Sequence, residues 1–361
     1  MNTADTTPWV HGGADALGVP RFDFSTNSNA CGPCAQALAA VQQADPGHYP
    51  DPHYTALREG LAAFHGVAVQ RVLLAGSASE FIFRVSAWVA RQGGGVWLPA
   101  HHYGDYARAA QAWGLPRVAE PGQAALVWAC EPSSPLGQGH ADWSPWLAVP
   151  PASGAEPVLV LDGAYAPLRL SGAPSLSEQQ RQRVWQLFTP NKALGLTGVR
   201  AAYVIAPEGA QDAVAALQLL APSWPLGAHG VAMLQAWLQP SVQEWLRDSL
   251  DTLRGWKSRQ IALLSELGWT CLPSEANYFC ARPAPPLGLD AGDAAAWWTA
   301  ELARLRGQGI KLRDTASFGL PGQARLGVLP PAAQDALRAT WLNRAALDRH
   351  FAQGANLYPG K

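Results

Sequence analysis

The sequence predicts an α/β fold, because short apolar segments alternate along the chain with longer amphipathic ones. The apolar segments have the length of buried strands and lie at 72–75, 96–98, 125–129, 158–161 and 201–206. Each is continuously apolar, which is typical of a parallel sheet that helices cover on both faces. One helix is expected from the turn at 76–80 to about Arg91, and another near 103–113.

The pattern changes after about residue 240. A long amphipathic helix is expected over 241–268, followed by short strands at 278–281, 310–312 and 324–328 and by helices near 290–307 and 331–352. This order favours a smaller α+β domain that is joined to the first one through the long helix. The segment Arg282–Gly288 is rich in proline and is interpreted as a surface loop.

The composition argues against several functional classes. The chain has 361 residues, enough for about two domains, and its 26 basic and 27 acidic residues give a net charge of −1. This balance leaves no excess positive charge for a nucleic-acid backbone, so no nucleic-acid partner is expected. No apolar run reaches the ~18 residues of a membrane helix, and the first residues lack the basic segment of a secretory signal. We therefore expect a cytoplasmic protein without a membrane partner.

The five cysteines, at positions 31, 34, 130, 271 and 280, are an odd number, which indicates a reduced chain rather than a disulfide framework. Cys31 and Cys34 have the spacing of a thiol redox motif. Because a polar loop rather than a strand precedes them, we interpret them as thiols that flank a Gly-Pro turn. No second pair of cysteines or histidines lies at ligand spacing, so no metal site is expected.

The turn at 76–80 joins a buried strand to a helix and carries Ser77 and Ser79. Free backbone N–H groups and the helix dipole make such a turn a candidate anion site, typically for phosphate. Ordinary capping of the helix by a serine explains the same residues.

Lys192 is the candidate nucleophile. Only four of the 26 basic residues are lysines, at 192, 257, 311 and 361, and Lys192 lies in an apolar and glycine-rich context just after a short strand. Desolvation and neighbouring cations activate such an amine for Schiff-base chemistry. Asp162 ends the strand at 158–161, where open α/β sheets place their ligands, although a turn-forming aspartate can take the same position.

The order Asp162-x-x-Tyr165, Lys192-x7-Arg200 and a distal Arg325 resembles the fold type I enzymes that use pyridoxal 5′-phosphate (PLP), the aminotransferase class I/II superfamily. The resemblance covers nearly the whole chain. It implies a large PLP-binding domain over 45–240, with a mostly parallel sheet between helices, and a small α+β domain over 241–361. An N-terminal arm over 1–44 would contribute to the small domain and to the active site.

The resemblance also implies roles for single residues. Lys192 would hold the cofactor as a Schiff base, Asp162 would keep its pyridine nitrogen protonated, and Tyr165 would form a hydrogen bond with its O3′ atom. Tyr103 would stack on the cofactor ring. The cofactor phosphate would be bound by Ser77, Ala78, Thr189 and Arg200.

Within the superfamily, the N-terminal half resembles two families. His11-Gly12-Gly13, the segment 24–29 and Gly32-Pro33 look like the start of the L-threonine-O-3-phosphate decarboxylases of cobalamin biosynthesis. The segment 48–52 is shared with histidinol-phosphate aminotransferases, and in both families the tyrosine that matches Tyr49 reaches the cofactor phosphate of a neighbouring subunit. This implies a homodimer. Substrate groups would be bound by His11, Asn29, Arg313 and Arg325, the last of these pairing with the α-carboxylate.

The chain departs from the superfamily pattern at the cofactor site. The segment 131–137 reads Glu-Pro-Ser-Ser-Pro-Leu-Gly where Asn-Pro-x-Asn-Pro-x-Gly is usual, so Ser134 takes the place of an asparagine that binds the cofactor O3′ atom. Asn191, directly before Lys192, replaces the usual serine or threonine.

The resemblance implies a carbon–carbon lyase that decarboxylates L-threonine O-3-phosphate to (R)-1-aminopropan-2-yl phosphate and CO2. The alternative is an aminotransferase, of the histidinol-phosphate type or for another amino acid, with the same residues and with Lys192 as general base. A third interpretation, suggested by Ser134 and Asn191, is a PLP-fold binding protein that has lost catalysis.

Overall fold

The computed structural model describes residues 11–140, 143, 147 and 157–344. The chain divides into two compact units, a larger one formed by Ser28–Asp251 and a smaller one formed by Met1–Asn27 with Thr252–Lys361. The first boundary lies at Asn27 rather than at position 44, because helix α1 (Ala35–Gln42) packs against helix α8 (Ala228–Trp237) of the larger unit. The second boundary lies inside the long helix α9 (Pro240–Glu266) rather than before it.

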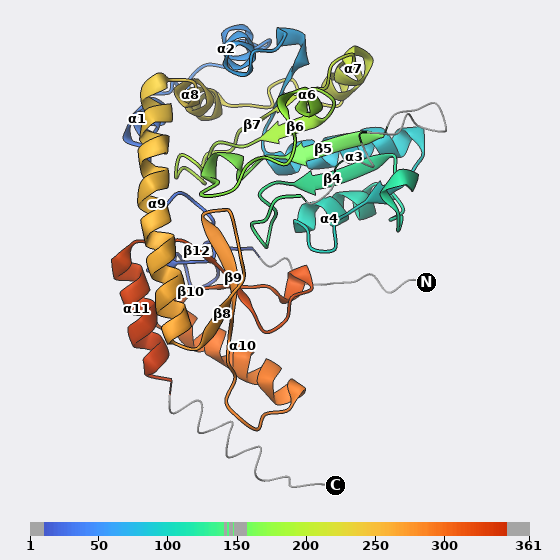
Figure 1. Cartoon of the computed structure of the whole chain (residues 1–361). Coiled ribbons are helices and arrows are strands. Elements are labelled where there is room, and N and C mark those ends of the chain that lie inside the picture. The colour runs from blue at the N-terminus through green and yellow to red at the C-terminus, as the bar shows by residue number, and fades with distance from the viewer. Residues whose placement is uncertain (1–10, 141–142, 144–146, 148–156, 345–361) are drawn as a thin grey trace. The chain divides into compact units, whose positions relative to one another are not determined.

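A six-stranded sheet forms the centre of the larger unit, with the strand order β2-β7-β6-β5-β4-β3 (Figure 1). The strands are β2 (Val72–Ala75), β3 (Val96–Trp97), β4 (Leu126–Cys130), β5 (Val158–Asp162), β6 (Trp185–Phe188) and β7 (Ala202–Ile205). Strand β7 runs antiparallel to both of its neighbours, and the other pairs are parallel. The prediction of a mostly parallel α/β sheet is therefore confirmed.

The strands are buried on both faces of the sheet. In β4, Leu126 and Trp128 pack into one apolar cluster, and Val127 and Ala129 pack into another. Because successive side chains of a strand point to opposite faces, the two clusters lie on opposite sides of the sheet. The first cluster also contains side chains of α3 (Ala78–Gln92), α4 (Gly104–Ala112) and α7 (Gln211–Leu219). These helices therefore cover one face.

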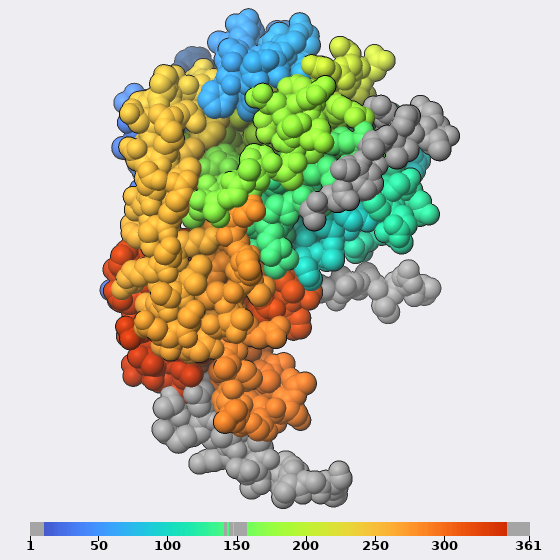
Figure 2. Space-filling view, viewed as in Figure 1, coloured from blue at the N-terminus to red at the C-terminus, as the bar shows by residue number. Residues whose placement is uncertain are grey.

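Further short elements complete the larger unit. They are α2 (Thr55–His65), α6 (Glu178–Arg181) and the 3₁₀ turns η1 (Val69–Arg71), η2 (Pro121–Gln123) and η3 (Ala166–Leu168). Helices α2 and α6 form part of the outer surface in the space-filling view (Figure 2). Within the described ranges, none of the helices has both the length and the apolar composition needed to cross a membrane.

The smaller unit is built on a four-stranded antiparallel sheet with the order β11-β12-β9-β8. Its elements are β8 (Trp269–Cys271), β9 (Tyr278–Pro283), α10 (Ala291–Gly307), β11 (Arg313–Asp314), η4 (Ala316–Phe318), β12 (Ala324–Gly327) and α11 (Pro331–Leu342). Strand β1 (Phe22–Asp23) pairs in parallel with β10 (Ile310–Lys311), which attaches the N-terminal segment to this unit.

Two predicted elements of the smaller unit have different bounds in the structure. Strand β9 continues through Arg282 and Pro283, which were expected in a loop, because β8 pairs with it as far as Trp269 opposite Pro283. Helix α11 ends at Leu342, and the end of the predicted helix, from 345 onward, lies outside the described residues.

A partly buried histidine makes the stability of the larger unit depend on pH. Nε2 of His65, at the end of α2, lies 2.9 Å from the Tyr203 hydroxyl, and burial lowers the pKa of His65 to about 4. In an unfolded chain the pKa of histidine is about 6.5. Between these two pH values the unfolded chain binds a proton that the folded chain does not. The free energy of unfolding is therefore highest above about pH 6.5 and falls by up to about 3 kcal/mol as the pH drops toward 4.

We expect His65→Asn to remove much of this pH dependence. The measurement is urea unfolding of both proteins at about pH 7 and about pH 5, with the difference between the two free energies as the readout. His53→Asn is the matched control, because His53 is exposed on the surface. If His65→Asn kept the full wild-type difference, another group would be responsible.

Candidate active site

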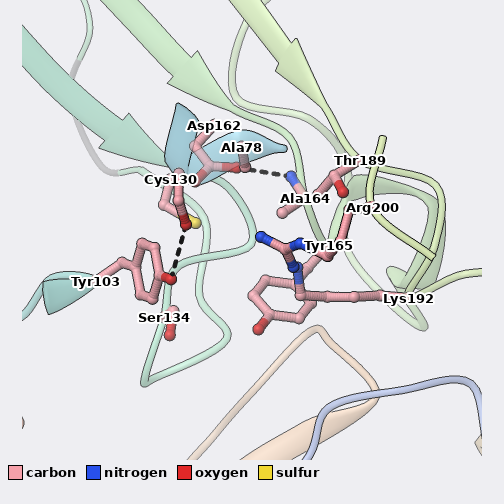
Figure 3. Close-up of a pocket in the computed structure, with 11 residues that line it drawn as sticks. Ala78, Tyr103, Cys130, Ser134, Asp162, Ala164, Tyr165, Thr189, Lys192 and Arg200 are labelled. Carbon is pink, nitrogen blue, oxygen red and sulfur yellow. Dashed lines mark hydrogen bonds between the residues drawn. The ribbon is translucent and has the colours of Figure 1, made fainter. Parts of the chain in front are cut away.

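A cavity opens at the carboxyl ends of strands β4, β5 and β6 in the larger unit (Figure 3). It is lined by Ala78, Ser79, Tyr103, Cys130, Ser134, Asp162, Ala164, Tyr165, Thr189, Lys192 and Arg200. Open α/β sheets bind their ligands at this edge. Most of the cofactor-binding residues predicted from the sequence therefore lie around one cavity. Ser77 and Tyr49 are not among the lining residues.

Asp162 supplies a buried carboxylate to this cavity. It is the last residue of β5, and its side chain is 4% exposed. Oδ1 accepts a hydrogen bond from the backbone N–H of Ala164 at 2.9 Å, and Oδ2 accepts one from the Tyr106 hydroxyl at 2.6 Å. Burial raises the pKa of Asp162, while the two hydrogen bonds and the charge of Lys192 act in the opposite direction. The donors thus favour the ionised carboxylate against the cost of burial.

Tyr106 is a functional candidate that the sequence reasoning missed. Its ring stacks on Trp128, with centroids 4.4 Å apart and planes 9° apart, and this contact aims the hydroxyl at Asp162. Its spacing from Tyr103 could have identified it in the sequence, because residues three apart lie on the same face of a helix. Tyr103 precedes α4 and Tyr106 lies in its first turn, so both can point from that helix toward the sheet.

The turn that carries Lys192 is held from behind by the segment 29–34. The backbone N–H of Asn29 donates to Lys192 O at 2.9 Å, and that of Cys34 donates to Leu194 O at 2.9 Å. A Cβ atom on Gly32 would lie 3.0 Å from Leu194 O, so a glycine suits this close approach. The Lys192 Nζ atom lies 5.2 Å from the centroid of the Tyr165 ring. In Figure 3 the side chains of Thr189, Lys192 and Arg200 enter the cavity from one side and Tyr103 from the other.

Asn29 has a structural role in the larger unit. Its side-chain amide donates to Ala193 O at 3.0 Å and to Ser249 Oγ at 2.8 Å. The predicted contact with substrate would compete with these two hydrogen bonds, and it stays a prediction. Cys31 and Cys34, in the same segment, form no disulfide.

One end of the cavity is suited to an anion. Ala78 and Ser79 are the first residues of α3, and the first backbone hydrogen bond of this helix runs from Phe81 N–H to Ser77 O. The N–H groups before it point out of the helix end. Ser77 instead caps the helix, since its Oγ accepts from Glu80 N–H at 3.0 Å. The turn therefore offers free N–H groups to an anion and is also capped by a serine, and Ser77 has the capping role.

The departures in the segment 131–137 have a local explanation. Arg169 donates to Glu131 Oε1 at 2.6 Å, and the backbone N–H of Ser175 donates to the same oxygen at 2.8 Å. The Glu131 side chain is buried, and this ion pair compensates its charge. Ser134, at the position of the usual asparagine, lines the cavity.

Tyr49 lies on the surface of the larger unit. It is 78% exposed and stacks on Trp224, with ring centroids 4.4 Å apart. An exposed aromatic pair of this kind suits a protein interface. The contact of Tyr49 with a neighbouring subunit stays a prediction.

The smaller unit holds two adjacent arginines. Arg313 on β11 and Arg325 on β12 are direct cross-strand partners, and both are buried. Both guanidinium groups lie near the Phe318 ring, at 4.7 and 5.6 Å from its centroid. Burial and the charge of Arg325 lower the pKa of Arg313 to about 10. Two like charges in this position favour the binding of an anion.

The His11-Gly12-Gly13 segment is attached to the same unit. A Cβ atom on Gly12 would lie only 2.2 Å from Ser25 O, so the chain passes Ser25 at a distance that only glycine allows. The backbone N–H of Gly13 donates to Ser25 Oγ at 2.9 Å, and Lys311 donates to Gly13 O at 2.6 Å. His11 itself is exposed.

Comparison with known proteins gives a consistent result. The family model described as aminotransferase class I and II matches residues 19–124 and 117–339. Histidinol-phosphate aminotransferase from Jannaschia sp. is 27% identical, over 89% of this chain and 89% of that protein. Histidinol-phosphate aminotransferase 2 from Caulobacter vibrioides is 29% identical, over 90% of this chain and 87% of that protein.

Two solved structures share the fold. The histidinol-phosphate aminotransferase from Sinorhizobium meliloti, crystallised with pyridoxal-5′-phosphate, has a TM-score of 0.70 and 21% identity, covering 90% of each chain. The L-threonine-O-3-phosphate decarboxylase from Porphyromonas gingivalis has a TM-score of 0.66 and 18% identity, covering 89% of this chain and 97% of that one.

Proposed function

Because the chain belongs to the aminotransferase class I and II family, we propose that it is a PLP-dependent aminotransferase for a small phosphorylated amino compound of the histidinol-phosphate type. One observation carries the proposal. A lysine amine, a buried carboxylate and a helix N-terminus line the same cavity at the carboxyl edge of the sheet. The names of the related proteins favour amino transfer over decarboxylation, which reverses the order of the two functions expected from the sequence.

The lining residues fit the cofactor. Lys192 offers the amine that binds its aldehyde, Asp162 offers a carboxylate for its pyridine nitrogen, and Arg200 with the N-terminus of α3 offers donors for its phosphate. When bound, the cofactor supplies an electron sink for the bond that breaks at the substrate α-carbon. An ionised Asp162 would strengthen that sink, because its negative charge would stabilise positive charge on the pyridine nitrogen.

We assign proton transfer at the substrate α-carbon to Lys192. With substrate bound, the Lys192 amine would remove the proton from the substrate α-carbon. Arg313 and Arg325 would bind the anionic groups of the substrate, because two adjacent buried guanidinium groups match a phosphate or a carboxylate. We further propose a homodimer, to which the exposed pair Tyr49 and Trp224 would contribute.

Decarboxylation of L-threonine O-3-phosphate is the second candidate. The observation that favours it is the anchoring of Gly12 and Gly13 on Ser25, because His11-Gly12-Gly13 is part of the resemblance to the decarboxylases. In that reaction the bond from the α-carbon to its carboxylate breaks, and Lys192 returns a proton to the α-carbon. The same residues thus serve both reactions, and the orientation of the substrate chooses the bond.

The test uses the purified chain loaded with PLP. It is incubated with histidinol phosphate, with L-threonine O-3-phosphate and with common amino acids, each with and without a 2-oxo acid. Amino transfer leaves the amino group on the cofactor as pyridoxamine 5′-phosphate when the 2-oxo acid is absent, which mass spectrometry detects. Release of CO2 from L-threonine O-3-phosphate, without that product, would establish the decarboxylase instead. If neither reaction occurred while PLP remained bound, the catalytic proposal would be lost.

Replacing Tyr106 by phenylalanine is expected to raise the pKa of Asp162. The lost hydrogen bond favours the ionised carboxylate, while burial acts against it. The acid limb of the kcat/KM profile should therefore move to higher pH. On that limb kcat/KM should fall by about tenfold, and at high pH it should fall by less. The phenylalanine ring can still stack on Trp128.

Tyr203→Phe is the control for this variant, because the Tyr203 hydroxyl contacts His65 and is not among the lining residues. Its acid limb should match that of the wild type. An unshifted limb in Tyr106→Phe would show that this hydroxyl does not control the charge of Asp162.

A further inference from the structure

Asn191 lies next to the nucleophile in sequence but is not among the residues that line the cavity. Its side chain is 4% exposed and forms hydrogen bonds with the two segments that carry Thr189 and Arg200. We propose that Asn191 is a positioning residue for the phosphate of PLP and that it acts through Arg200 and Thr189. The inference rests on the proposed function, because it concerns the cofactor that this function requires.

The first contact is with the chain that leads into Arg200. The Nδ2 atom of Asn191 lies 3.3 Å from Val199 O and 3.4 Å from Thr197 O. Val199 O belongs to the peptide group whose N–H is that of Arg200. The Asn191 amide therefore restrains the backbone immediately before the arginine.

The second contact, through Thr189, reaches the backbone that follows Arg200. The hydroxyl of Thr189 lies 2.8 Å from Asn191 Oδ1 and 3.3 Å from Ala201 O. Thr189 and Asn191 are both buried, and their side chains are hydrogen-bonded to each other. Together they reach the carbonyl groups before and after Arg200, and they tie this arginine to the turn that carries Lys192.

Arg200 needs such support because its side chain is exposed. Among the residues that the structure describes, it forms no ion pair that would hold the guanidinium in place. When Arg200 binds an anion, its side chain and its backbone both lose conformational freedom. Because the backbone is already restrained, binding carries only the entropy cost of ordering the side chain.

The same contacts change the role of Thr189. A hydroxyl donates one hydrogen, and here the nearest acceptors are Asn191 Oδ1 and Ala201 O. The sequence predicted Thr189 as a direct phosphate donor. With its hydrogen used in this way, Thr189 would support Arg200, and its direct contact with the phosphate stays a prediction.

The test compares PLP with pyridoxal, which has the same ring and aldehyde but no phosphate. Dissociation constants of both are measured by absorbance titration of the apo forms of wild type, Asn191→Ala and Asn191→Leu. Leucine fills a similar volume without hydrogen bonding, which keeps the test available if the alanine variant does not fold. Arg200→Ala serves as the reference for loss of phosphate binding.

We expect both Asn191 variants to bind PLP about tenfold more weakly, the effect of losing buried hydrogen bonds that orient a charged group. Their affinity for pyridoxal should stay within about twofold of the wild type, because the site of the aldehyde is unchanged. Equal losses of affinity for PLP and pyridoxal, or no loss of affinity for either compound, would overturn the inference. If the wild type bound neither compound, the proposed function itself would fail, which is a different outcome.

Discussion

Replacing Lys192 by alanine is expected to abolish covalent attachment of the cofactor and to lower turnover by about 10⁴-fold or more. The reason is chemical rather than structural. A Schiff base needs a primary amine, and among the residues that line the cavity Lys192 is the only lysine. The same amine would move the proton at the substrate α-carbon, so one substitution removes both roles. The backbone hydrogen bond from Asn29 to Lys192 O does not involve the side chain, so the turn should persist.

The measurement is reduction with borohydride followed by peptide mapping. The wild type should retain a pyridoxyl group on the peptide that contains Lys192, and Lys192→Ala should retain none. Lys192→Arg tests the chemistry more narrowly, because it keeps the positive charge without a primary amine. Lys311→Ala is the control, since Lys311 forms an ion pair with Asp15 in the smaller unit. A reducible chromophore in Lys192→Ala with the wild-type spectrum would disprove the assignment.

Five of the six strands of the larger sheet could be predicted because each is a short apolar segment between polar residues or glycines, whereas β6 contains Gln186 and was not given bounds. The segment 72–75 matches strand β2, and 158–161 matches β5 to within one residue. The direction of β7 could not be predicted, because an apolar segment buried on both faces has the same pattern in either direction. Strand β1 was missed for another reason. It has two residues, and its partner β10 begins at Ile310, so nothing local identifies it.

The candidate site was predictable where the chemistry requires one residue type. Lys192 and Asp162 were found because an amine and a carboxylate stood at the ends of predicted strands. Tyr106 was missed because its role depends on the direction of its hydroxyl, which is set by its stacking on Trp128. The role of Asn29 was assigned to the substrate from the resemblance. Its hydrogen bonds with Ala193 and Ser249 depend on folding of distant segments and leave no trace in sequence spacing.

Replacing Asp162 by asparagine is expected to lower kcat by about 10³-fold, which corresponds to about 4 kcal/mol of transition-state stabilisation. Asparagine keeps the size of the side chain but loses its negative charge. Asp162 lies at the end of β5 with 4% exposure, so little solvent screens that charge and its effect on a bound group is strong. Affinity for the cofactor should fall less, because Lys192 and the phosphate donors remain.

Kinetics at saturating substrate and absorbance titration with PLP separate these two effects. The sharpest check combines Asp162→Asn with Tyr106→Phe. If Tyr106 acts through the charge of Asp162, its replacement should lower kcat in the wild type and have almost no further effect in Asp162→Asn. Additive losses would mean that Tyr106 acts independently of the carboxylate. A single Asp162→Asn variant within about tenfold of the wild-type kcat would instead show that the reaction does not depend on a charged partner at this position.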